Sequence, residues 1–281
     1  MNTRLFLGSV AALLVIPAPA SAQNVEAGFD SSTVGRCDDC FAGAIALPFT
    51  LNYFGNNYGT TFVSNNGYIT FGNGSGTFTP TGLGAAYAGL PIIAPFFADV
   101  DTRPALGGFT QYGANTFNGM SAWGATWTDV GYFANHTDKT NTFQVLLVDR
   151  SDITGGDFDI YFNYDRILWE TGDASGGVNG FGGTSAAAGF NAGTGGGAGT
   201  YYGLPGSLVD GALLDGGPNS LVAGSNIGDP GRYLFTVRNG QVVVPGAVPE
   251  PAAWAMMLLG FGFVGGAMRA AKRRTVAVRY A

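Results

Sequence analysis

Short runs of alternating apolar and polar residues make up most of the chain, and glycine and asparagine separate them. Alternation with a period of two is typical of β-strands, because successive side chains point to opposite faces of a sheet. The clearest case lies at residues 61–71, where two β-rich runs flank Asn65, Asn66 and Gly67. Asparagine and glycine accept the positive φ of a tight turn, so this segment predicts a β-hairpin.

Other strands follow from the same pattern. At residues 158–164, phenylalanine and isoleucine occupy one face, and aspartate, tyrosine and asparagine occupy the other. Because the apolar face of such a strand must be covered, the chain predicts a mainly β domain, a two-layer antiparallel arrangement like a β-sandwich. The remaining predicted strands are residues 45–51, 91–101, 120–128, 142–148, 186–190, 201–202, 231–237 and 241–244.

The N-terminus has the features of an export signal. Arg4 precedes an apolar run at residues 5–16, and Ala20-Ser21-Ala22 stands before Gln23. The run is too short to span a membrane, and small residues at these positions are typical of a signal-peptidase site. Residues 1–22 are therefore predicted to be a signal peptide, cleaved between Ala22 and Gln23.

The C-terminus combines three features in a fixed order. The triplet Pro249, Glu250 and Pro251 precedes an apolar run at residues 252–268, which as a helix of roughly 25 Å is near the lower limit for a membrane span. A basic cluster follows, which would hold the far end of this hydrophobic helix in the cytoplasm. The cluster comprises Arg269, Lys272, Arg273 and Arg274.

This C-terminal segment resembles the PEP-CTERM sorting signal. The Pro-Glu-Pro triplet continues into Trp254-Ala255-Met256-Met257 and a Gly-Phe-Gly at residues 260–262, as in one variant of the family. The tail 275–281 departs from the pattern, since the family usually stops at its arginines. The resemblance implies processing by an exosortase in a Gram-negative bacterium that makes exopolysaccharide. The helix 252–268 would then hold the protein at the inner membrane only transiently.

The composition agrees with export. The chain has 47 glycines, 21 phenylalanines and 12 tyrosines but only 11% charged residues, which suits an extracellular β-protein with many turns. Without Arg4 and the five basic residues at the end, seven basic residues remain against 19 acidic ones, a net charge near −12. Such a charge argues against nucleic acid as a partner.

Two motifs carry candidate chemistry. Cys37 and Cys40 enclose two aspartates, a spacing that fits a redox pair, half a zinc site or a local disulfide. In an exported segment with no second cysteine pair and one distant histidine, His136, the disulfide is favoured. Asp99 and Asp101 stand two apart on a strand, so both carboxylates could face one calcium ion. Alternatively they solvate a strand end or cap the next turn, with Arg103 as partner.

A second resemblance emerges from the order of several short segments. It begins at residues 94–101 with Ala-Pro-Phe-Phe-Ala-Asp-Val-Asp, and together these segments resemble the extracellular nidogen-like (NIDO) domain. The resemblance implies cell–matrix adhesion and no catalytic residues. It divides the chain into a signal peptide, an N-terminal β region at 23–93 packed with the main domain, a nidogen-like domain at 94–244, and a linker with the sorting signal at 245–281. The other segments are residues 127–133, 141–147, 158–164, 167–172, 187–190 and 202–207.

The function predicted from these features is a non-enzymatic adhesion or biofilm module at the cell surface or in the extracellular matrix. Its expected partners are an exosortase and exopolysaccharide, or matrix or surface proteins, and no cofactor is required beyond a candidate calcium ion. One histidine and two paired cysteines leave little material for nucleophilic catalysis. The alternatives are a secreted carbohydrate-active hydrolase using a pair such as Asp157 and Asp159, or a calcium-dependent carbohydrate-binding protein.

Overall fold

The structure is a computed structural model that describes residues 24–243, 261, 264–265 and 268–269. The signal peptide with Ala22 and Gln23, the triplet 249–251, and most of the predicted helix 252–268 lie outside the described residues, as do Lys272, Arg273 and Arg274. Arg269 is described and exposed. Within the described part of the chain, no helix is long and apolar enough to cross a membrane.

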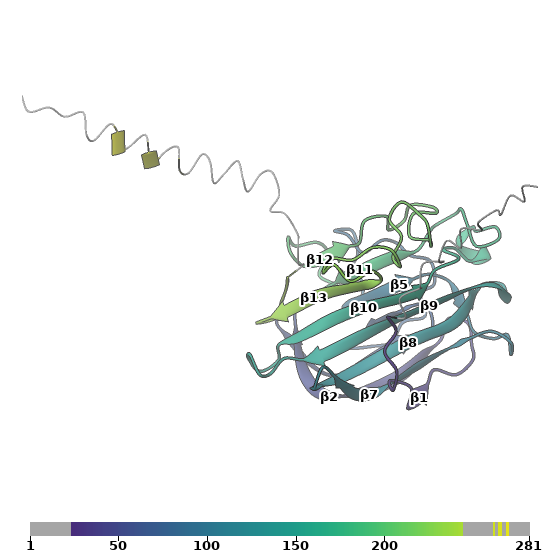
Figure 1. The fold of residues 1–281 in the computed structure, drawn as a ribbon, viewed down its shortest axis with the longest axis horizontal. Helices are drawn as coiled ribbons and strands as arrows, with labels where there is room; N and C mark the ends of the chain where they lie inside the picture. The colour runs from purple at the N-terminus through teal and green to yellow at the C-terminus, as the bar shows by residue number, and fades with distance from the viewer. Residues whose placement is uncertain (1–23, 244–260, 262–263, 266–267, 270–281) are drawn as a thin grey trace, which may run out of the picture.

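The described chain is mainly β and forms two antiparallel sheets, as predicted (Figure 1). One sheet has the order β1-β7-β8-β9-β10-β13-β14, with β6 paired to β8, and the other has the order β12-β11-β5-β4-β3-β2. The strands are β1 (Ser32–Thr33), β2 (Phe41–Tyr53), β3 (Asn56–Ser64), β4 (Tyr68–Thr70), β5 (Ile92–Phe97), β6 (Val100–Asp101), β7 (Phe109–Phe117), β8 (Met120–Tyr132), β9 (His136–Asp149), β10 (Phe158–Arg166), β11 (Ala187–Asn191), β12 (Tyr201–Gly203), β13 (Arg232–Arg238) and β14 (Gln241–Val243), with a 3-10 helix, η1, at Asp173–Ser175.

The core lies between the two sheets and is rich in aromatic rings. Trp127 of β8 stacks on Phe143 of β9, with ring centroids 5.1 Å apart, and Phe143 also packs against Phe96 of β5 at 5.2 Å. Phe96 comes from the second sheet, so these rings join the two layers. Burying side chains of this size is the main favourable contribution to the free energy of folding.

Strand β7 was missed by the sequence analysis. Its residues 109–117 include threonine, glutamine and asparagine, so their apolar alternation is weak. The better signal was the Asn118-Gly119 pair that follows, because both residues have a positive φ and make a tight turn into β8. An Asn-Gly pair between two strands is the same signal that located the hairpin of β3 and β4.

The predicted hairpin is present, but its turn is buried. β3 and β4 pair through Ser64 and Tyr68, and Asn65, Asn66 and Gly67 between them lie inside the protein. Gly67 has φ +81°, and a Cβ there would overlap the carbonyl oxygen of Phe96. The turn therefore needs glycine for its backbone conformation and for the close approach of β5.

We predict that Gly67→Ala lowers the free energy of unfolding by roughly 3–5 kcal/mol, because it adds steric overlap to an unfavourable φ. Gly55→Ala is the matched control, since Gly55 has φ +84° with open space around its Cβ position. It should cost only about 1–2 kcal/mol. Urea unfolding of both variants measures the difference, and equal losses would contradict a tight contact at Gly67.

Candidate functional site

An acidic cluster, formed by Asp38, Asp39 and Asp99, lies beside the disulfide. One carboxylate oxygen from each residue lies within 4.8 Å of the other two. Asp38 and Asp39 belong to the disulfide loop, residues 37–40, whereas Asp99 lies between β5 and β6. Residues separated by some 60 positions in the chain therefore meet at one point.

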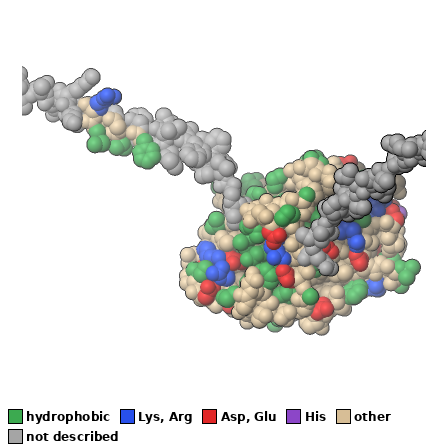
Figure 2. Space-filling model, in the orientation of Figure 1, with side chains coloured by type: hydrophobic (Ala, Val, Ile, Leu, Met, Phe, Trp, Pro, Cys, Tyr) green, Lys and Arg blue, Asp and Glu red, His purple; other side chains and the backbone are tan. Residues whose placement is uncertain are grey.

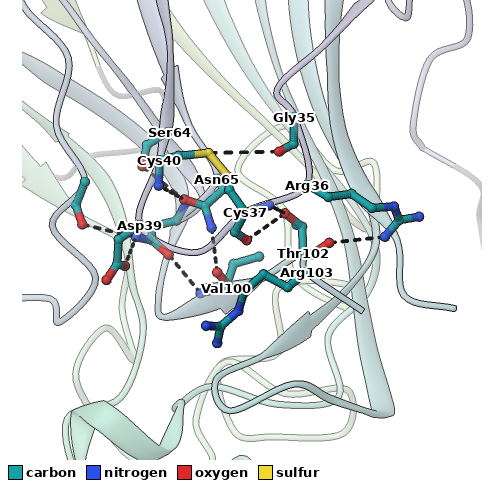
Figure 3. Close-up of a disulfide and its surroundings, with 12 residues drawn as sticks. Gly35, Arg36, Cys37, Asp39, Cys40, Ser64, Asn65, Val100, Thr102 and Arg103 are labelled. Atoms are coloured by element: carbon teal, nitrogen blue, oxygen red, sulfur yellow. Dashed lines mark hydrogen bonds between the residues drawn. A yellow bond between two sulfur atoms is a disulfide. The ribbon is translucent and has the colours of Figure 1, made fainter. Parts of the chain in front are cut away.

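The disulfide loop is held on two sides. Cys37 and Cys40 are joined, with their Cα atoms 6.0 Å apart. The backbone N–H of Thr102 donates to the carbonyl of Cys37 at 3.0 Å, and the N–H of Cys37 donates to Oγ1 of Thr102 at 3.0 Å. On the other side, Asn65 lies between Cys40 and Val100 (Figure 3), accepting from the N–H of Cys40 and donating to the carbonyl of Val100 at 2.7 Å.

The two aspartates predicted as calcium ligands have different surroundings. The side chain of Asp101 accepts hydrogen bonds from Arg103 Nε at 2.9 Å and from the backbone N–H of Asn135 at 2.9 Å, which matches the alternative with Arg103 as partner. Asp99 faces Asp38 and Asp39 instead. The reason is that the chain passes from one sheet to the other between β5 and β6, so strand alternation does not extend from Asp99 to Asp101.

The acidic cluster holds carboxylate oxygens without donors. Within the part of the chain that is described, Oδ1 of Asp38 and Oδ2 of Asp99 are buried and have no hydrogen-bond partner. Burial and the neighbouring carboxylate of Asp39 raise the pKa of Asp99 to about 7. The same two causes raise the pKa of Asp38 to about 6. Burial would also raise the pKa of Asp101, but hydrogen bonds from Arg103 and Asn135 lower it below its usual value.

Asp157 and Asp159, the pair named for the alternative hydrolase function, make structural contacts. Asp159 is bound by Arg150 at 2.9 Å and by Arg238 at 2.6 Å. Asp157 accepts a hydrogen bond from the backbone N–H of Asn239 at 2.7 Å. Asp159 thus joins β10 to Arg150 and to the end of β13, and Asp157 joins the loop before β10 to the turn after β13.

A groove of about 410 Å³, the tyrosine groove, is lined by Tyr202 of β12 and Tyr233 of β13. Asn219 and Asn226 lie in its wall, and the amide of Asn226 is held by the backbone of Leu234 through two hydrogen bonds of 2.8 Å. The alternation of the sequence predicts strands at residues 201–202 and 231–237 but does not predict that Tyr202 and Tyr233 lie together. They belong to different sheets, and no local pattern reports that proximity.

The loop that precedes the tyrosine groove is held by a buried acid. Glu170 is fully buried, and its two carboxylate oxygens accept the backbone N–H groups of Gly211 and Leu213, each at 2.6 Å. Burial raises the pKa of Glu170 to about 7, although the two N–H donors act in the opposite direction.

The two antiparallel sheets place the protein in the class of all-β sandwich domains. The disulfide between its two cysteines suits an oxidising compartment. The chain belongs to the nidogen-like domain family, which it matches over residues 59–239. Residues 247–274 match the PEP-CTERM protein-sorting motif. Together the domain and the motif indicate an exported surface protein.

Curated relatives include vertebrate and insect proteins. The chain is 30% identical to alpha-tectorin of Gallus gallus over 268 residues, which cover 86% of this chain and 12% of that protein. It is 32% identical to alpha-tectorin of Homo sapiens over 229 residues, 74% of this chain and 10% of that protein. Nidogen of Drosophila melanogaster is 27% identical over 220 residues, covering 69% of this chain and 15% of nidogen. The chain thus spans a small part of these relatives, and no solved structure matches it.

We predict that Glu170 makes the domain less stable as pH rises. Its folded pKa lies near 7, above the ordinary 4.5, so the folded state binds the proton more tightly than the unfolded state. The free energy of unfolding should therefore fall between about pH 4.5 and pH 7, by about 1.4 kcal/mol for each unit of pKa shift. Urea unfolding across this range should show a smaller fall in Glu170→Gln. A pH-independent difference between the two proteins would contradict the raised pKa.

Proposed function

We propose that this protein is a non-enzymatic interaction module delivered to the cell surface or the extracellular polymer matrix, where it acts in adhesion or biofilm structure. The observation that carries the proposal is the presence of a nidogen-like domain and a PEP-CTERM sorting motif in one chain. The sorting motif implies an exosortase as processing enzyme. The domain ahead of it is then the part that acts after export.

Several side-chain contacts support a binding role over catalysis. Of the acids considered for hydrolysis, Asp159 is bound by two arginines, so it is not free to act as a general acid or base. Asp157 is buried, with Oδ1 bonded to the N–H of Asn239 and Oδ2 without a donor among the described residues. Both cysteines are in the disulfide, which removes them as nucleophiles.

The character of the surface supports a carbohydrate of the extracellular matrix as partner. Acidic and basic side chains are mixed on the face shown in Figure 2, and most of that face is neither charged nor hydrophobic. The tyrosine groove adds aromatic rings from Tyr202 and Tyr233 beside amide groups. Aromatic rings pack against the apolar faces of sugars while amides and hydroxyls hydrogen-bond to their edges.

We expect the sorting motif to be processed in the native host. Fractionation of cells with and without the exosortase, followed by mass spectrometry of the mature C-terminus, should show cleavage near Pro249–Pro251 only when the enzyme is present. Without the exosortase the protein should remain with the membrane fraction. An intact C-terminus at Ala281 on all mature protein in exosortase-positive cells would contradict processing.

We expect Tyr202→Leu to weaken binding of the exported protein to the host's exopolysaccharide by about tenfold or more, since a stacking ring is lost while an apolar side chain is kept. Tyr201→Leu is the matched control, because Tyr201 is the adjacent residue of β12 but does not line the tyrosine groove. Co-sedimentation with purified exopolysaccharide measures both, and unfolding curves confirm that the variants fold. Equal binding by both variants would exclude the groove as the sugar site.

A further inference from the structure

We propose that the acidic cluster of Asp38, Asp39 and Asp99 is a calcium site that holds the disulfide loop against the β-sandwich. This role is separate from the tyrosine groove and does not depend on the identity of the matrix partner. The proposal assigns a function to Asp38 and Asp39, the two aspartates between Cys37 and Cys40.

The strongest observation is the buried carboxylate of Asp99. This residue is only 1% exposed, and its Oδ2 has no hydrogen-bond donor among the described residues. Oδ1 of Asp38 is buried and without a donor as well. A buried ionised oxygen needs a compensating donor or cation, because removing it from water is costly. Each of these two residues also contributes a carboxylate oxygen to the acidic cluster, so a cation placed there would compensate the charge of both carboxylates.

The charge around the acidic cluster is strongly negative. Asp101 adds a fourth carboxylate beside Asp38, since both contact the same guanidinium of Arg103. The cation in contact is Arg103, whose Nη2 lies 3.2 Å from Oδ2 of Asp38 and 2.5 Å from Oδ2 of Asp101. The guanidinium therefore contacts Oδ2 of Asp38 and Oδ2 of Asp101, whereas Oδ1 of Asp38 and Oδ2 of Asp99 have no donor among the described residues.

The donor set favours calcium. The three ligand atoms are carboxylate oxygens within 4.8 Å of one another, a span that a calcium ion with bonds of about 2.3–2.6 Å can bridge. Both sulfurs are joined in the disulfide, so no thiolate is offered to a softer metal. Magnesium demands a near-ideal octahedron and dehydrates reluctantly, whereas calcium accepts irregular sets completed by water.

The side chain of Asn66 and the backbone of Gly172 keep two of the ligands in place. Asn66 Nδ2 donates to Oδ1 of Asp39 at 2.9 Å, which orients that carboxylate and leaves its second oxygen available. Gly172 lies against the side chain of Asp99, and a Cβ at this position would come within 2.7 Å of its Cγ. A glycine at 172 is therefore needed for the Asp99 carboxylate to occupy its observed position.

The test is a calcium titration of the full chain, produced in an oxidising compartment, stripped with EDTA and studied at neutral pH in mild detergent. Isothermal titration should show one site with a dissociation constant of about 10⁻³ M or tighter, the range of extracellular calcium sites. The midpoint of thermal unfolding should rise with calcium. Magnesium should bind at least about tenfold more weakly.

Variants assign the site. Asp99→Asn and Asp39→Asn should each weaken calcium binding at least about tenfold, since the charge and number of ligands set the affinity. Asp39 is exposed, so its variant remains informative if Asp99→Asn does not fold. Asp30→Asn is the control, because it removes an equal charge from an exposed position outside the acidic cluster. In EDTA, Asp99→Asn should be at least as stable as the unmodified chain, because it removes repulsion between carboxylates.

Three outcomes would overturn the proposal. The first is the absence of both heat and a thermal shift up to about 10 mM calcium, well above the expected range. The second is calcium affinity in Asp39→Asn and Asp99→Asn equal to that of Asp30→Asn. The third is magnesium binding as tight as calcium binding, which would exclude the assigned ion.

Discussion

The buried turn between β3 and β4 is the constraint on which the rest of the structure depends. The backbone carbonyls of Asn66 and Gly67 accept hydrogen bonds from the N–H groups of Ala98 and Phe96. The turn therefore fixes the position of the chain where it leaves β5 for the opposite sheet. Trp127 of that opposite sheet donates to the carbonyl of Asn65 at 2.9 Å. The same turn thus joins both sheets and the disulfide loop. The side-chain amides of Asn65 and Asn66 are buried as well and hydrogen-bond to the backbone of Cys40 and Val100, so replacing either asparagine would leave these backbone groups without their partners.

Much of the fold was predictable from local patterns. Residues 158–164 and 61–71 carry the period of two and the turn residues that define strands and hairpins, and the structure has β10 and the β3–β4 hairpin there. Strand β7 was not predicted because polar side chains interrupt its apolar alternation. Its strand conformation is stabilised by pairing with β8 along its whole length, which the alternation does not report. What the sequence did not reveal was the burial of the turn at 65–67, since asparagine and glycine usually indicate exposed turns.

The candidate site shows where local reasoning fails. Asp99 was a candidate calcium ligand because of its spacing from Asp101, but that spacing has meaning only within one strand, and the chain changes sheets at this point. Asp38 and Asp39 were considered only as neighbours of the cysteines. Their approach to Asp99 is accompanied by hydrogen bonds between the disulfide loop and Thr102 and Asn65, which connect positions far apart in sequence. Contacts of this kind follow from the fold and not from periodicity.

The proposed calcium site also explains why so short a loop carries a disulfide. Closing a loop of four residues restricts the unfolded chain by only about 2 kcal/mol in the chain-entropy view, a modest gain in stability. A cross-link between Cys37 and Cys40 does, however, restrict the directions that Asp38 and Asp39 can take, and so reduces the conformational entropy lost when both bind one ion. The environment outside the cytoplasm is the one that favours both disulfide formation and occupation of a calcium site of this affinity. The loop, which is hydrogen-bonded to Thr102 and Asn65, would then bind its calcium ion after export, once the disulfide has formed.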